Sequence, residues 1–123
     1  MLKLLAIPTL LAGATHAFGF WNQIPIDAYY PEGSDFLIQW TPDANRTDTF
    51  RLELYTFSND TGNINETTTV LNPAAKYSDG NFTWHIELIE DRSGPEWWYR
   101  FGAQLSTIGE VASYARAFHI EAL

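Results

Sequence analysis

The chain has 123 residues, no cysteine and a formal net charge of −8, and 46% of its residues are hydrophobic. This length fits one domain with one core and excludes two. The acidic balance excludes a surface that attracts nucleic acid or anionic membranes, and the lack of cysteine excludes disulfides and thiolate metal sites.

The first residues have the layout of a secretory signal. Lys3 supplies a positive charge, residues 4–12 form an apolar run, and small residues lead up to Ala17. An apolar run this short spans only part of a bilayer as a helix. The pattern predicts a signal peptide over 1–17, cleaved after Ala17, and a single mature domain over 18–123. We therefore expect a secreted protein with no membrane span.

Beyond the signal, apolar and polar residues alternate with a period of two, and turn-forming residues separate the alternating segments. This pattern predicts an all-β fold of about seven strands. The predicted strands are 20–28, 35–41, 49–57, 66–71, 82–88, 97–105 and 114–120. Short strands of this number favour an antiparallel β-sandwich of the immunoglobulin or fibronectin III type, with a small closed barrel as the alternative.

Alternation also assigns each strand residue to a side of its sheet. The predicted inward positions are Phe36, Ile38, Trp40, Phe50, Leu52, Leu54, Phe82, Trp84, Ile86, Leu88, Tyr99, Phe101, Ala103, Leu105, Phe118 and Ile120. The predicted outward positions are Arg51, Glu53, Tyr55, Thr83, His85, Glu87, Trp98, Arg100, Gln104 and His119.

Four segments fit the acceptor pattern for N-glycosylation, Asn-x-Ser/Thr. They begin at Asn45, Asn59, Asn65 and Asn81, and each falls in a turn-rich break or at the start of a predicted strand. Together with the signal peptide, they predict a glycoprotein made in a eukaryotic secretory pathway.

The candidate ligand site is aromatic. In a sandwich of this type the third and sixth strands lie in one sheet. Arg51 and Tyr55 would then lie beside Trp98 and Arg100 on its outer face. Exposed Trp and Tyr flanked by charged groups can stack on a sugar ring or anchor a protein partner. The alternative is that the N-terminal segment 18–26 partly covers Trp98.

We expect no catalytic activity and no cofactor. The sequence contains no nucleophile–base constellation and no phosphate loop, and the acidic residues Glu87 to Glu96 lie around turns. His85 and His119 are expected on opposite sheets, which predicts no metal site. A copper-binding protein with His16 as its mature N-terminus would require cleavage after Thr15, which fits the cleavage pattern less well than Ala17.

Four segments carry a resemblance to a known family: GSDFLIQWTPD (33–43), FRLELY (50–55), DGNFTWHI (79–86) and ARAFHI (115–120). They resemble the N-terminal, immunoglobulin-like domain of the fungal cell-wall synthesis family typified by Kre9 and Knh1. FLIQWTP (36–42) and the segment 99–118 also resemble a fibronectin type III domain. Both resemblances imply the same sandwich, and neither brings catalytic residues.

The Kre9/Knh1-like resemblance implies a location in the fungal cell wall or the extracellular space. We therefore expect a secreted, non-catalytic protein that binds a cell-wall glycan or an extracellular protein. The alternative function is that of a carbohydrate-binding module for β-glucan or chitin.

Overall fold

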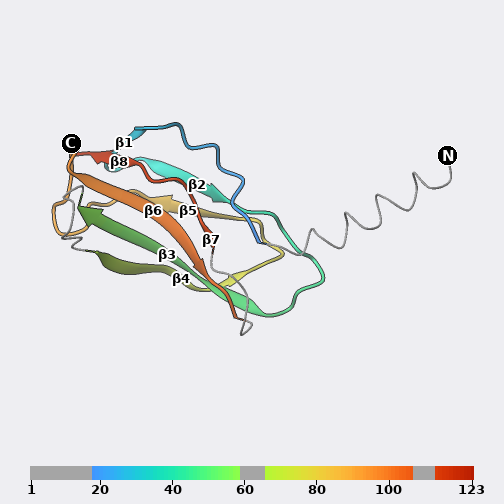
Figure 1. Cartoon of the computed structure of the whole chain (residues 1–123). Coiled ribbons are helices and arrows are strands. Elements are labelled where there is room, and N and C mark those ends of the chain that lie inside the picture. The colour runs from blue at the N-terminus through green and yellow to red at the C-terminus, as the bar shows by residue number, and fades with distance from the viewer. Residues whose placement is uncertain (1–17, 59–65, 107–112) are drawn as a thin grey trace, which may run out of the picture.

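The computed structural model describes residues 18–58, 66–106 and 113–123. The described residues form strands and no helix, so the predicted all-β class is confirmed (Figure 1). The strands are β1 (Tyr29–Pro31), β2 (Asp35–Gln39), β3 (Thr49–Ser58), β4 (Thr67–Lys76), β5 (Asn81–His85), β6 (Trp97–Gln104), β7 (Ser113–Tyr114) and β8 (His119–Glu121). The described ranges therefore contain no helix that is long and apolar enough to cross a membrane.

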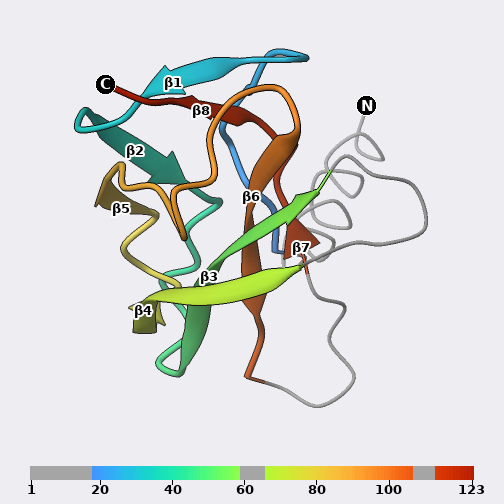
Figure 2. The ribbon, with the colours of Figure 1, turned by 90° about the vertical axis from the view of Figure 1, so that its left-hand side faces the viewer.

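The strands form three sheets. The largest is antiparallel with the order β4-β3-β6-β7, a second antiparallel sheet pairs β2 with β5, and the small β1-β8 pair is parallel. Figures 1 and 2 show β2 and β5 on one side of the molecule and β3, β4 and β6 on the other. Within the described ranges these sheets do not join into a closed barrel. The arrangement is consistent with a β-sandwich.

Aromatic contacts fill the space between β2-β5 and the four-stranded sheet. Trp40 meets Phe50 edge to face, with ring centroids 5.1 Å apart, and Trp84 meets Phe101 in the same way at 5.6 Å. All four of these side chains are buried. Such edge-to-face pairs add stability to the burial of apolar area. The predicted inward residues of β3, β5 and β6 therefore form the core.

The predicted strand over 20–28 is wrong. Phe20 makes a single bridge to Trp40, and the first strand begins only at Tyr29. The reason lies in the intervening residues: the Ala28 N–H donates to the Pro25 carbonyl in a turn, and Asp27 has a φ of 57°. A left-handed residue breaks an extended ladder, and Pro25 has no N–H to donate to one.

The other predicted strands all differ from the observed bounds, most of them by one to three residues, and two differ more. The fourth runs on to Lys76 as β4, and shifts in its register against β3 lie around Leu52. The predicted strand 114–120 divides into β7 and β8. Its two parts pair with different neighbours, since β7 joins β6 and β8 joins β1.

Two residues predicted to face outward do lie on the outer side of their strands but are buried, so their expected exposure is wrong. Glu53 and His119 are each only 3% exposed. Both follow the alternation of their strands, but rings of β1 and β6 pack on His119, and Arg51 and Tyr55 of the same strand bond to Glu53. The covering residues belong to the candidate site.

Candidate binding face

The pairing of β3 with β6 brings the four predicted site residues to one face. Tyr55 lies opposite Arg100, and Arg51 lies four pairs further along, opposite Gln104. Trp98 lies two residues before Arg100 on β6, which puts it on the same side of the sheet. We call the outer surface formed by Arg51, Tyr55, Phe57, Trp98, Arg100 and Tyr114 the aromatic face.

Arg100 lies among the rings of this face. Its Cζ atom is 4.4 Å from the ring centroid of Tyr114, 5.4 Å from that of Phe57 and 5.7 Å from that of Tyr55. Its Nη2 atom is 3.8 Å from a carboxylate oxygen of Glu66. Rings that surround a guanidinium in this way hold it by cation–π attraction. The buried Nε atom of Arg100 has no hydrogen-bond partner.

Tyr114 belongs to this face although the sequence analysis missed it. Gly102 pairs with Tyr114, whereas Tyr99 pairs with Phe118. Three steps along β6 therefore match four steps along the other strand, which is the signature of a bulge. Alternation carried back from Phe118 would turn Tyr114 inward, but the bulge turns it outward, and its side chain is 49% exposed.

A glycine in β6 makes room for the two tyrosine rings. A Cβ added to Gly102 would lie 3.1 Å from a ring carbon of Tyr114 and closer still to the ring of Tyr55. The rings of Tyr55 and Tyr114 thus cover the backbone at Gly102, with their centroids 5.6 Å apart. A sheet glycine often marks such a close approach, and this one is the signal in the sequence that an aromatic cluster lies above it.

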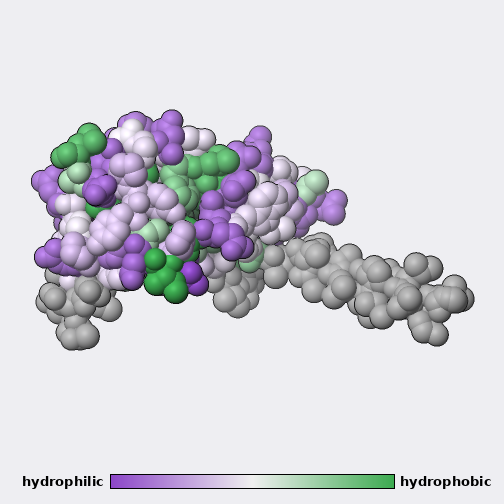
Figure 3. Space-filling view, turned by 90° about the horizontal axis from the view of Figure 1, so that it is seen from above, coloured by the Kyte–Doolittle hydropathy of each residue, from purple (hydrophilic) through white to green (hydrophobic). Residues whose placement is uncertain are grey.

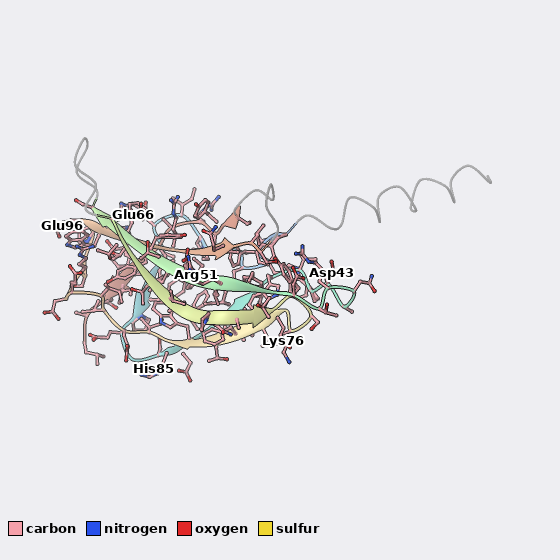
Figure 4. The ribbon with its side chains drawn as sticks, turned by 90° about the horizontal axis from the view of Figure 1, so that it is seen from below. Asp43, Arg51, Glu66, Lys76, His85 and Glu96 are labelled. Carbon is pink, nitrogen blue, oxygen red and sulfur yellow. The ribbon has the colours of Figure 1, made fainter. Side chains whose placement is uncertain are left out.

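The buried carboxylate of Glu53 lies under the edge of this cluster. It accepts hydrogen bonds from the Tyr55 hydroxyl and from Nε of Arg51, the latter at 2.7 Å. Burial, and then the hydrogen bond to Glu53, raise the pKa of Tyr55 well above its ordinary value. Figure 4 shows Arg51 near the middle of the view and Glu66 at the end of the molecule that also carries Glu96.

Trp98 is half-buried rather than fully exposed. Its ring packs against His119, with centroids 3.9 Å apart, so part of the indole is covered from the C-terminal strand β8. The exposed aromatic surface of the face is therefore contributed mainly by Tyr114. The surface over β1 and β8, seen from above in Figure 3, is mostly hydrophilic with small separate apolar groups.

The two described histidines lie on different sheets, as expected. His85 on β5 pairs with the Asp35 carboxylate at 2.9 Å in an exposed position, and His119 lies on β8. Within 18–58, 66–106 and 113–123, no three His, Asp or Glu side chains gather as a potential metal site. Residues 1–17, with His16 and the predicted signal peptide, lie outside the described residues.

The acidic residues Glu90 and Asp91 occupy a turn before β6. Both have positive φ angles, 53° and 59°, and Glu90 pairs with Arg92 at 3.0 Å. Asp is one of the residues that adopt a left-handed conformation in turns, and both side chains are exposed. This gives the acidic cluster a local structural role.

Two of the four predicted glycosylation sites are described, and both are exposed. Asn45 lies in the loop after β2, where its N–H donates to the Asp43 carboxylate at 3.0 Å. Asn81 is the first residue of β5. Asn59 and Asn65 lie outside the described residues.

No protein-family model, curated protein or solved structure matches this chain. Its function must therefore be argued from its own residues.

Proposed function

We propose that this chain is a secreted, non-catalytic immunoglobulin-like protein of the fungal extracellular space or cell wall, and that it binds an extracellular partner through the aromatic face. The sheet order supports the immunoglobulin-like assignment. A β2-β5 pair lies against a sheet of order β4-β3-β6-β7, and the first strand runs parallel to the last. The four segments that resemble the Kre9/Knh1-like domain lie largely in its core strands.

The observation that carries the binding role is the cluster of Tyr55, Phe57 and Tyr114 around Arg100 on an outer sheet surface. The outer face of an antiparallel sheet is ordinarily polar. Tyrosine, tryptophan and arginine are the residues that most often carry binding energy at protein interfaces. Tyr114, at 49% exposure, is the most accessible ring of the cluster.

The ring geometry favours a protein partner over a flat polysaccharide surface. The planes of Tyr55 and Tyr114 are inclined by 60°. Stacking on the flat surface of chitin or of insoluble β-glucan calls for rings that lie in one plane. Inclined rings instead form a surface of uneven relief, which suits a protein side chain or a single sugar.

A carbohydrate-binding module remains the second candidate. Arg51 has half of its side-chain surface exposed, and Gln104 beside it is also exposed. An exposed guanidinium and an amide next to an accessible tyrosine supply the donors and acceptors that sugar hydroxyls need. This candidate predicts binding to β-glucan or chitin themselves.

The test uses the secreted protein and isolated fungal cell walls, before and after protease treatment of the walls. We expect the protein to bind untreated walls and Tyr114→Ala to bind at least about tenfold more weakly. His85→Ala, which removes an exposed ring from the opposite sheet, should bind normally. Binding that disappears after protease treatment indicates a protein partner, whereas binding that persists indicates a polysaccharide. Unchanged binding by Tyr114→Ala would exclude the aromatic face as the site.

The mature N-terminus distinguishes the secretory proposal from the copper alternative. Sequencing the protein secreted by a eukaryotic host should give Phe18 as its first residue. A start at His16, with uptake of copper, would support the copper-binding alternative.

A further inference from the structure

The outer surface of the β2-β5 sheet carries an exposed tryptophan and a glycosylation sequon in one row. Asn81 lies directly opposite Gln39 in the ladder. On the other side of Gln39, the backbone N–H of Trp21 donates to the backbone carbonyl of Gln39 at 2.8 Å. Because Phe20 and Trp40 bridge with their side chains toward the core, Trp21 and Gln39 face outward.

A hydrogen bond holds the Trp21 ring over this sheet. Its Nε1–H donates to the hydroxyl of Thr41 at 2.9 Å. Thr41 follows β2, two residues after Gln39, so this bond draws the indole toward the strand that separates it from Asn81. The ring is nevertheless 48% exposed.

Leu37 extends the apolar surface beside this row. It is 46% exposed and lies opposite Thr83, the third residue of the sequon. An exposed Trp and Leu on one sheet face leave apolar area in water, and covering that area is favourable. The sequon supplies a covering group from within the same face.

We propose that an N-linked glycan on Asn81 lies across this surface and packs its inner sugars on the Trp21 indole. The inference depends on the secretory route of the proposed function. Adjacent strands lie about 4.8 Å apart, so the backbones at Asn81 and Trp21, separated by one strand, are roughly 10 Å apart. The first sugars of an N-glycan span such a distance. The C–H face of a pyranose is apolar and stacks on the large flat surface of an indole.

The glycan then has a structural role at this site. The chain has no disulfide to stabilise it, and burying the indole removes apolar area from water. Asn45 offers the matched comparison, because it lies in a loop and its N–H bonds to Asp43. A glycan there is expected to project into solvent.

The test is a double-mutant cycle on the protein secreted by a eukaryotic host. Mass spectrometry of glycopeptides gives the occupancy of Asn81 and Asn45. We expect Asn81→Gln to lower Tm by several degrees and Asn45→Gln to leave it nearly unchanged. In a Trp21→Ser background, Asn81→Gln should have little further effect, because the partner of the glycan is already absent. Nuclear Overhauser contacts between indole and sugar protons should appear in the wild type.

An equal loss of Tm on Asn81→Gln with and without Trp21 would overturn the inference, as would an unoccupied Asn81. Those results leave the proposed function standing if the protein is secreted and Tyr114→Ala still weakens binding. If the protein is neither cleaved after its signal peptide nor glycosylated at any site, both the proposed function and this inference are wrong.

Discussion

The indole of Trp98 packs against the imidazole of His119 from the neighbouring strand, with ring centroids 3.9 Å apart. Tyr29 stacks on the same imidazole at 4.6 Å. The Nδ1–H of His119 donates to the carbonyl of Trp97 at 2.8 Å. These contacts tie β1, β6 and β8 together where the parallel pair meets the larger sheet.

His119→Ala should therefore destabilise the fold. The substitution removes a ring that is only 3% exposed, together with its hydrogen bond to the Trp97 carbonyl. We expect the free energy of unfolding to fall by about 2 kcal/mol, as is usual for loss of a buried, hydrogen-bonded side chain. Urea denaturation followed by tryptophan fluorescence measures it.

The control for this substitution is His85→Ala. His85 is exposed and its partner Asp35 is equally accessible, so the change should be within about 0.5 kcal/mol. Equal losses for the two histidines would show that the stacking of His119 contributes nothing specific.

Gly102→Ala should also destabilise the protein, because the new methyl group would collide with the ring of Tyr55 and crowd Tyr114. Overpacking of this kind costs about 1–3 kcal/mol. In a Tyr55→Ala background the same substitution should be milder, since the closest ring is gone. Denaturant unfolding of all four proteins measures the coupling.

Gly19→Ala is the matched control, since a Cβ there meets nothing within 4 Å. It should leave stability within about 0.5 kcal/mol of the wild type. If Gly102→Ala were equally harmless, the two tyrosine rings would not be packed over the glycine as described.

Alternation predicted the buried sides of β3, β5 and β6 correctly because each of these strands has one face on the core. Phe50, Leu52 and Leu54 are all buried, as are Trp84 and Phe101. Because one face of each strand is buried and the other faces solvent, apolar and polar residues alternate along the strand. It also placed Tyr55 and Arg100 on one face, because their pairing follows from which strands are neighbours.

The remaining features depend on contacts between distant parts of the chain. Tyr114 joins the aromatic face only through a bulge, and a bulge shifts the alternation without a marker at the residue itself. His119 and Glu53 hold outward positions, yet both are buried: rings of β1 and β6 pack on His119, and Glu53 is held by Arg51 and Tyr55 of its own strand. The alternation within one strand predicts which residues face inward and which face outward. It does not predict which other side chains cover the outward-facing residues.

The hydroxyl of Tyr55 should give stability a specific dependence on alkaline pH. Burial and the hydrogen bond to Glu53 raise the pKa of Tyr55, so its contribution is fully present below about pH 10, the ordinary tyrosine pKa, and is lost as the pH rises above it. Tyr55→Phe keeps the ring but removes the bond to the buried carboxylate, which should cost about 1–2 kcal/mol at neutral pH. The difference in unfolding free energy between wild type and Tyr55→Phe, measured from pH 7 upward, should stay constant up to about pH 10 and then shrink. A difference that stays constant throughout would mean that Tyr55 titrates alike in the folded and unfolded chain.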